Sequence, residues 1–392
     1  MNTQNIYGLF LGIIICPIAT GVTLSLPAKS AGPNTTVVVA ATLSAGMASI
    51  SGLQFDLQYD NSVLSLIATP GAAIRSSAKG MYIHDMAPNK KRFVIIGMNQ
   101  TSTPDGDVIR LFVNVGASAG PGSYDLTLTN VTGTDGAGNA VEMDSSSGTI
   151  IVDGTSGVRI EASGVLNAAS LLAGPVAPGE IITLIGSGIG PMTAQQPTSS
   201  NADTLLGGTS VLFDMTAAPL LYAAPNQINA IVPYGISGQN VTQVSILKEG
   251  KPIAGFSLDV SESAPAVFTL DGSGVGAGLL LNQDLTLNSP SNGAAPGSAA
   301  MFYANGAGIM APSPMDGKVA GDDPSHPILH VAVAIGGIDA EVRYAGSAPG
   351  LIAGILQVNC VIPPNIQTGD AVNMQLRIGA TSSPEGVVIA VR

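Results

Sequence analysis

The chain has 392 residues, of which 45% are hydrophobic and only 10% charged, and it contains 49 glycines and 26 prolines. Such a length predicts two or three domains, each with a hydrophobic core of its own. General disorder is excluded, because disordered chains are rich in charge and poor in β-branched residues. The formal net charge of −12 makes nucleic acid and anionic membrane surfaces poor partners.

An apolar run from Ile6 to Leu26 opens the chain. Small residues at Ala28 and Ser30 suit cleavage after residue 30, although the first five residues contain no Lys or Arg. We therefore predict a signal peptide over residues 1–30 and a secreted, extracellular or cell-surface protein. An uncleaved membrane anchor is the alternative. No later stretch is long and apolar enough to span a bilayer, so the mature chain is expected to have no membrane span.

Residues 31–153 are expected to form the first domain. Apolar and polar residues alternate from Leu53 to Tyr59, which is typical of a half-buried strand. Other short runs rich in Val, Ile and Thr lie between glycines and prolines, and they predict strands at 35–41, 63–66, 92–98, 108–115, 124–129 and 148–152. A series of short strands without helical periodicity predicts a jelly-roll β-sandwich.

Three parts of this domain carry a family resemblance: LQFDLQYDNSVL at 53–64, GDVI at 106–109, and LTLTNV with DGAGN at 126–131 and 135–139. In order and spacing they resemble the cohesin domain, the module that receives dockerins in cellulosome scaffolds. The resemblance implies a jelly-roll fold and a dockerin-like protein partner. Cohesins share this sandwich with scaffold carbohydrate-binding modules, so a polysaccharide partner remains the alternative.

The same resemblance places the strands at 53–59 and 92–98 in the sheet that meets the partner. Alternation turns Phe93 and Ile95 to one side and the next apolar residues to the other. The predicted partner-binding residues are Gln54, Asp56, Gln58, Val94, Ile96 and Met98. Together they would form an apolar patch with a polar rim, the composition of a protein-binding surface. A continuous apolar run also permits burial of both faces of the second strand.

Residues 154–392 contain an internal duplication. LLYAAPNQINAIVP at 220–233 recurs as RYAG at 343–346 and LQVNCVIP at 356–363, and APG at 177–179 recurs at 295–297. The repeat predicts two β-sandwiches, over 154–270 and 271–392. The pair resembles the duplicated Ig-like sandwich, of plexin and transcription-factor type, at the C-terminal ends of many secreted acidobacterial proteins. That resemblance implies architecture and export, without assigned chemistry.

Motifs that could indicate catalysis lack the required context. GASAG at 116–120 matches a nucleophile elbow, but Pro121 follows where a helix is needed. GSGIG at 186–190 lacks the spacing of a dinucleotide loop. His326 and His330 flank Pro327, which disfavours a shared helical face for metal binding. We therefore predict no enzyme activity, no metal and no cofactor.

Three further expectations concern single residues and short segments. Asp135 to Asn139 offers few oxygens for calcium and is more simply a turn. Cys360 stands where the first repeat has Ala230, which predicts a buried, unpaired thiol. There is no tryptophan, so platforms for sugar stacking are scarce, and Tyr82 and Tyr234 are the best candidates.

The sequence thus predicts an all-β, non-catalytic binding or scaffold protein that is secreted. Its cohesin-like module would mediate dockerin-type attachment to a protein or to a cell surface. The alternative is a carbohydrate-binding accessory module in extracellular polysaccharide breakdown.

Overall fold

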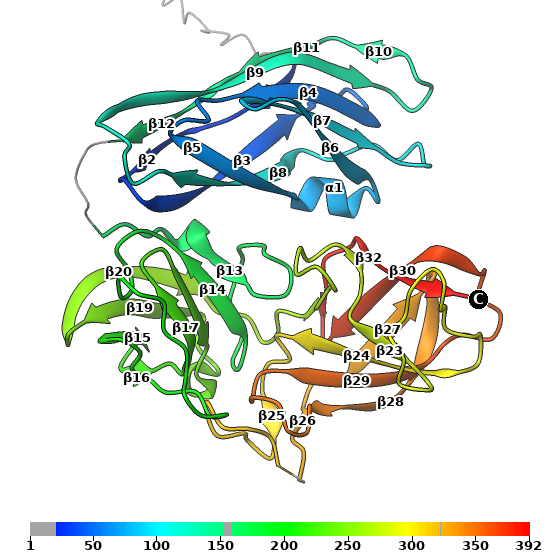
Figure 1. Ribbon diagram of the computed structural model, residues 1–392. Coiled ribbons are helices and arrows are strands. Elements are labelled where there is room, and N and C mark those ends of the chain that lie inside the picture. The colour runs from blue at the N-terminus through cyan, green and yellow to red at the C-terminus, as the bar shows by residue number, and fades with distance from the viewer. Residues whose placement is uncertain (1–20, 153–157, 322) are drawn as a thin grey trace, which may run out of the picture.

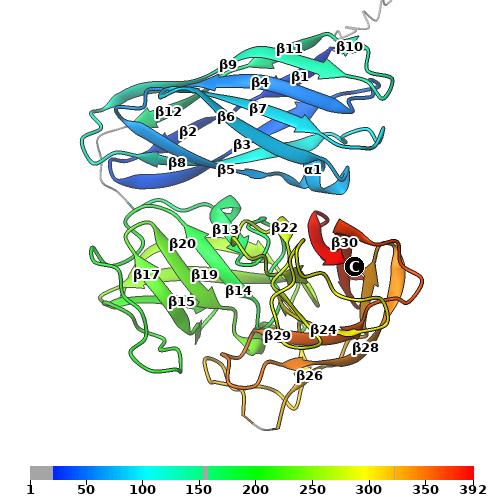
Figure 2. The same ribbon diagram turned by 45° about the vertical axis from the view of Figure 1, so that its right-hand side comes forward.

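The computed structural model describes residues 21–152, 158–321 and 323–392. Figures 1 and 2 show three β-units: the first domain lies above, and the two C-terminal units lie side by side beneath it. The prediction of a nearly all-β chain is confirmed, since the described residues contain one short α-helix, α1 (Ala72–Ser76), and two single 3₁₀ turns, at Ala162–Gly164 and Tyr234–Ile236. None of the described helices is long and apolar enough to cross a membrane.

The first domain is a sandwich of two sheets. One sheet has the order β11-β1-β3-β8-β5 and the other β2-β12-β9-β4-β7-β6, with β10 paired to β9. Their bounds are β1 Val22–Ser25, β2 Ala28–Ala31, β3 Thr35–Ser44, β4 Gly52–Gln58, β5 Leu64–Pro70, β6 Gly80–Ala87, β7 Lys90–Ile96, β8 Gly106–Val115, β9 Gly122–Thr134, β10 Ala140–Val141, β11 Met143–Ser146 and β12 Gly148–Val152.

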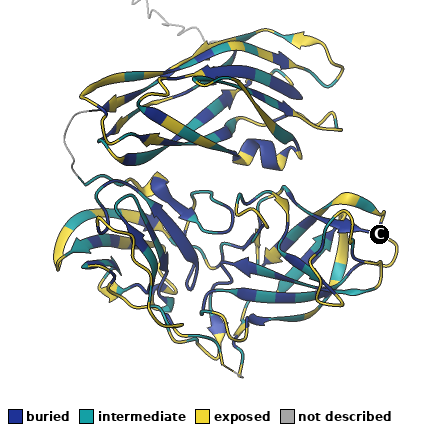
Figure 3. Ribbon diagram, in the orientation of Figure 1, coloured by how far each residue is buried: buried dark blue, intermediate teal, exposed yellow. Residues whose placement is uncertain are grey.

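Alternating side chains of both sheets fill the core between them, as the banded ribbons of Figure 3 show. The rings of Phe55 on β4 and Phe93 on β7 stack at a centroid distance of 5.0 Å. Both rings come from inward positions of strands whose alternation predicted this burial. The outward positions of the same two strands are therefore left on the far side of the sheet.

The start of this domain differs from the predicted boundary at residue 31. Strand β1 pairs with β3 and β11, and β2 pairs with β12. Leu24 is 0% exposed in the core. Cleavage after residue 30 would remove β1 and most of β2, so the predicted site is incompatible with this fold. The apolar run extends into β1 because a buried strand and a signal segment are both apolar. Residues 1–20, including Cys16, lie outside the described residues.

The second unit consists of two four-stranded sheets, β13-β14-β18-β17 and β16-β15-β19-β20. Side chains from both sheets form one core. The bounds are β13 Val165–Asn167, β14 Ile181–Ile185, β15 Thr209–Phe213, β16 Thr216–Ala217, β17 Leu220–Ala224, β18 Gln227–Ile231, β19 Val241–Lys248 and β20 Lys251–Asp259.

The third unit is built on a ten-stranded sheet with the path β21-β24-β29-β28-β27-β30-β32-β22. It begins at β21, ahead of the predicted boundary at residue 271, because β21 pairs with β24. The bounds are β21 Ala266–Val267, β22 Gly276–Ala277, β23 Leu280–Asn282, β24 Ala299–Asn305, β25 Met310–Ala311, β26 His326–Pro327, β27 Val331–Ile335, β28 Ile338–Ser347, β29 Leu356–Val361, β30 Gly369–Ile378, β31 Thr381–Ser382 and β32 Val387–Val391.

The two copies of the repeated sequence also have equivalent strand pairing, β17 with β18 and β28 with β29. Tyr222 lies opposite Asn229 just after a bulge in β17, and Tyr344 lies opposite Asn359 just after a bulge in β28. Ala230 and Cys360 occupy equivalent positions, and each is 0% exposed. Burial raises the pKa of the Cys360 thiol to about 12, so the prediction of a buried thiol is confirmed.

Polar contacts join the three units. Lys29 Nζ lies 2.7 Å from Glu161 Oε2, and Asn226 Nδ2 donates to Thr36 Oγ1 at 3.0 Å. Arg75 Nη1 donates to the Gly274 carbonyl at 2.9 Å. Thr36 lies on β3 and Arg75 on α1, whereas Lys29 lies on β2, at one edge of the other sheet. Figure 1 shows the β3–β8–β5 side of the first domain toward the C-terminal units. Within the opposite sheet, the edge strand β2 supplies the contact to the second unit through Lys29.

Candidate functional site

The candidate site is the outer face of strands β9, β4, β7 and β6, which lie side by side in the first domain (Figure 2). Gln54 on β4 is directly opposite Val94 on β7, and Val94 is opposite Tyr82 on β6. On the other flank, β9 sets Thr132 opposite Gln54. Directly opposite residues point to the same side of a sheet. We call this surface the outer face.

Apolar side chains are exposed on the β7–β6 half of the outer face. Ile96 is 51% exposed and Tyr82 61% exposed, and Met98 just beyond β7 is fully exposed. Val94 between them is partly buried. Tyr82 folds back over Gly80, where a Cβ atom would come within 3.1 Å of the ring. Because Gly80 pairs with Ile96, the tyrosine ring lies next to that side chain.

Asp56 occupies the centre of the outer face and is already fully engaged. Arg92 donates to it from Nε at 2.6 Å and from Nη2 at 3.0 Å, and Lys90 Nζ lies 3.1 Å from Oδ2. Asn130 Nδ2 adds a hydrogen bond of 2.7 Å. The hydrogen bond from Arg92 lowers the pKa of Asp56 most, so the carboxylate stays ionised far below neutral pH.

This arrangement corrects the expectation that Asp56 is available to a partner. Its side chain points outward, as the alternation predicted, but it is 0% exposed. Lys90 and Arg92 cover it from the adjacent strand, while Gln54 is partly buried and Gln58 exposed. The sequence carried a signal for this, because Lys90 and Arg92 alternate with the core residues of β7 and must share a face with Asp56.

Asn130 reaches Asp56 through a local irregularity in β9. The register of β4 and β9 shifts between Gln54 and Asp56, and Asn130 has a positive φ of 52°. A bulge of this kind re-aims one side chain, and asparagine tolerates left-handed backbone better than most residues. The sequence alone did not indicate that Asn130 would bind Asp56.

The two tyrosines proposed for sugar stacking have different environments. Tyr82 is well exposed on the outer face. Tyr234 is partly buried against the core of the third unit, and its hydroxyl contacts Met310 Sδ at 3.7 Å. Burial raises the pKa of Tyr234 strongly. The expectation that Tyr234 forms an exposed platform is therefore wrong, because the third unit covers its ring.

The other motifs noted in the sequence make hydrogen bonds within the fold. Asp135 Oδ1 accepts hydrogen bonds from the backbone of Ala137 and Asn139, which is an Asx-type turn. His326 Nδ1 lies 2.7 Å from the Ala345 carbonyl. Within the ranges the structure describes, no group of three or more His, Cys, Asp or Glu residues could hold a metal ion; Asp322 lies outside those ranges.

The glutamine–asparagine pairs of the duplicated strands are structural. Gln227 Nε2 donates to Asn229 Oδ1 at 2.9 Å, and Gln357 Nε2 donates to Asn359 Oδ1 at 3.0 Å. Both copies therefore use the same internal hydrogen bond, on two strands with equivalent register.

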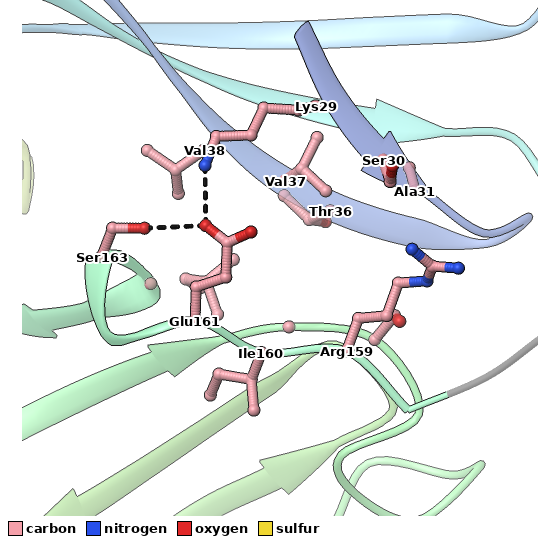
Figure 4. Close-up of a pocket in the computed structure, with 14 residues that line it drawn as sticks. Lys29, Ser30, Ala31, Thr36, Val37, Val38, Arg159, Ile160, Glu161 and Ser163 are labelled. Carbon is pink, nitrogen blue, oxygen red and sulfur yellow. Dashed lines mark hydrogen bonds and ion pairs between the residues drawn. The ribbon is translucent and has the colours of Figure 1, made fainter. Parts of the chain in front are cut away.

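A small pocket lies at the junction of the first and second units (Figure 4). Its wall includes Glu161, whose carboxylate contacts Lys29 and accepts a hydrogen bond from Ser163 Oγ at 3.2 Å. The nearby Lys29 lowers the pKa of Glu161. These side chains hold one another across the junction, so we assign the pocket to domain contact.

Comparison with known proteins bears on the first domain. Residues 22–152 match the family model described as "Cohesin domain". They form a cohesin domain. The matched range starts at β1, in agreement with the strand pairing and not with the boundary predicted from the apolar run. The C-terminal units have no such assignment.

Several solved structures are similar to this chain. The sixth cohesin of scaffoldin B from Acetivibrio cellulolyticus, in complex with a dockerin, is 22% identical, covering 34% of this chain and 100% of that chain with a TM-score of 0.32. CaCohA2 from Clostridium acetobutylicum is 21% identical over 34% and 92%, with a TM-score of 0.32. A non-cellulosomal cohesin from the archaeon Archaeoglobus fulgidus is 18% identical over 34% and 91%, with a TM-score of 0.30. No curated protein matches the chain.

Proposed function

We propose that this chain is a secreted, non-catalytic attachment protein whose cohesin domain binds a protein partner through the outer face. The observation that carries this proposal is the exposure of Tyr82, Ile96 and Met98 next to a polar centre that is already paired. A cluster of exposed apolar side chains rimmed by polar residues is typical of protein-binding surfaces. In this proposal the C-terminal units are Ig-like sandwiches that carry the cohesin domain.

The proposed partner is dockerin-like, since solved cohesins occur in complexes with dockerins. Gln54 and Gln58 would supply hydrogen bonds at the edge of the apolar cluster. Asp56 would act indirectly, because its pairing holds Arg92 and Lys90 flat against the sheet. This arrangement lowers the side-chain entropy lost on binding.

The test measures binding of the full chain to a panel of purified dockerin modules by surface plasmon resonance. Ile96→Asp should weaken binding at least tenfold, because it places a charge in the apolar centre of the interface. Gln54→Ala should weaken it less. The matched control is Ile67→Asp on β5, which is 70% exposed on the other sheet and should leave binding unchanged. A folded Ile96→Asp variant that binds as wild type would refute the proposed surface.

A polysaccharide ligand is the second candidate. It is favoured by Tyr82, an exposed ring on a sheet face, and by a polar hollow at the end of the same sheet lined by Gln58, Asp60, Asn61, Asn89 and Asp125, among others. Stacking on an aromatic ring and hydrogen bonds from such side chains suit a sugar. A glycan array distinguishes the candidates: Tyr82→Ala should abolish glycan binding, whereas Ile96→Asp should not.

A further inference from the structure

Strand β6 ends the larger sheet of the cohesin domain and has a hydrogen-bonded strand on one side only, although α1 and β5 lie close to it. It pairs with β7 over its length. Among the described residues, no loop or terminus adds a backbone hydrogen bond to Gly80–Ala87. The five residues from Tyr82 to Met86 are all exposed. A row of backbone donors and acceptors is therefore open to another strand.

The open edge is unusually apolar. Tyr82 on the outer face is 61% exposed and Ile83 on the opposite side is 43% exposed. Proteins usually guard such edges with charges, prolines or bulges. Strand β6 has only Asp85, which pairs with Lys91, and a register shift between Asp85 and Ala87. The charge and the register shift both lie at the C-terminal end of β6, so neither protects Gly80 to His84 from pairing with another strand.

We infer that β6 pairs antiparallel with β6 of a second copy of this chain. A register centred on Ile83 places the two Ile83 side chains opposite each other. It also sets Tyr82 opposite His84, and Met81 opposite Asp85. Each pair joins positions of the same parity, so the core-facing sides and the outer faces of the two copies coincide.

The charges at this edge favour a second copy. In the register centred on Ile83 no like charges face each other, and the two Asp85 carboxylates lie about 14 Å apart along the strands. This distance exceeds the screening length of about 8 Å at physiological salt. Lys90, Lys91 and Arg92 on the neighbouring strand pair with only two carboxylates, Asp56 and Asp85, so this part of the sheet does not share the net acidity of the whole chain. The two sheets would become one, and their outer faces would form one continuous surface.

The first test is sedimentation equilibrium of the full chain over a range of concentrations. We expect a monomer–dimer equilibrium in the wild type. Ile83→Lys would place two ammonium groups opposite each other and should raise the dimer dissociation constant at least tenfold. Ile67→Lys, at an exposed position on the edge strand of the other sheet, is the matched control and should not change it. Ile96→Asp on β7 should also leave the dimer intact.

The second test checks the register of the two β6 strands by disulfide crosslinking. In a chain with Cys16→Ser, Ile83→Cys should form a covalent dimer on mild oxidation, because opposite residues of paired strands lie within disulfide range. Met98→Cys, at a position that is more exposed than Ile83, should not form one. Cys360 is buried and remains as an internal control. A wild type that is monomeric at all concentrations, a dimer unaffected by Ile83→Lys, or equal crosslinking through Met98→Cys would overturn the inference.

Discussion

Glu180 marks a position at which the two C-terminal repeats differ. It follows the APG segment of the second unit, where the third unit has Ser298. Its side chain is buried, and Oε2 accepts a hydrogen bond of 2.7 Å from the backbone of Ala177. Burial is the main cause that raises the pKa of Glu180, to about 8. The hydrogen bond from Ala177 opposes this shift without cancelling it.

A folded-state pKa above the unfolded value of 4.5 means that the folded protein binds the proton more tightly. The stabilisation is complete below the unfolded pKa and is lost as the pH rises toward about 8. We expect Glu180→Gln to remove this loss, which amounts to at most about 1.4 kcal/mol per pH unit. Urea unfolding at pH 5, 6.5 and 8 measures the difference. Parallel pH profiles for wild type and variant would contradict it.

At the scale of elements, β1 decides where the cohesin domain begins. It fills the gap between β3 and β11 in one sheet, and its residues Val22 and Leu24 are buried in the core. Nothing in the apolar run from Ile6 to Leu26 marks the point where a segment becomes part of the sheet. Pairing partners that are far away in the sequence, at 42–44 and 143–146, determine it.

A chain that starts at Ala31 should therefore be much less stable than one that starts at Gly21, which retains every described residue. The shorter chain loses two or more buried apolar side chains, each contributing about 1.5–3 kcal/mol. It also leaves β11 without its partner strand and one edge of β3 unpaired, while β3 keeps its pairing with β8. We expect loss of the cooperative unfolding transition of the first domain, or insoluble protein. Thermal unfolding followed by circular dichroism measures this. Equal transition temperatures for the two chains would show that β1 is dispensable.

At the scale of the whole molecule, Arg75 joins the cohesin domain to the third unit. Its guanidinium donates to the Pro70 carbonyl from Nε at 3.0 Å and to the Gly274 carbonyl from Nη1 at 2.9 Å. Arg75 is only 2% exposed. Burial and the nearby Arg110 lower its pKa to about 10, so it remains charged at neutral pH. Among the described residues, no carboxylate forms an ion pair with it.

We expect Arg75→Ala to reduce the free energy of unfolding by about 1–3 kcal/mol, because two carbonyl groups lose a buried donor. The effect should extend across the junction, so that calorimetry shows the cohesin domain unfolding separately from the C-terminal units. Arg343→Ala, at a surface arginine whose side chain is 58% exposed, is the control and should change stability by less than about 0.5 kcal/mol. A single unchanged transition in Arg75→Ala would rule out this coupling.

The sequence by itself determined the all-β class, the cohesin domain, the duplication and the inward and outward sides of β4 and β7. The class, the duplication and the two sides of the strands follow from local periodicity, turn residues and repeated segments. The cohesin domain was expected from the resemblance of short segments, such as 53–64 and 126–131, to that family. Only the tertiary structure decided that Asp56 is covered, that β1 belongs to the sandwich, that Tyr234 packs partly buried against the third unit and that Arg75 spans two units. The physical reason is that alternation specifies which side of a strand a residue faces. What lies on that side depends on strands and units that are distant in the chain.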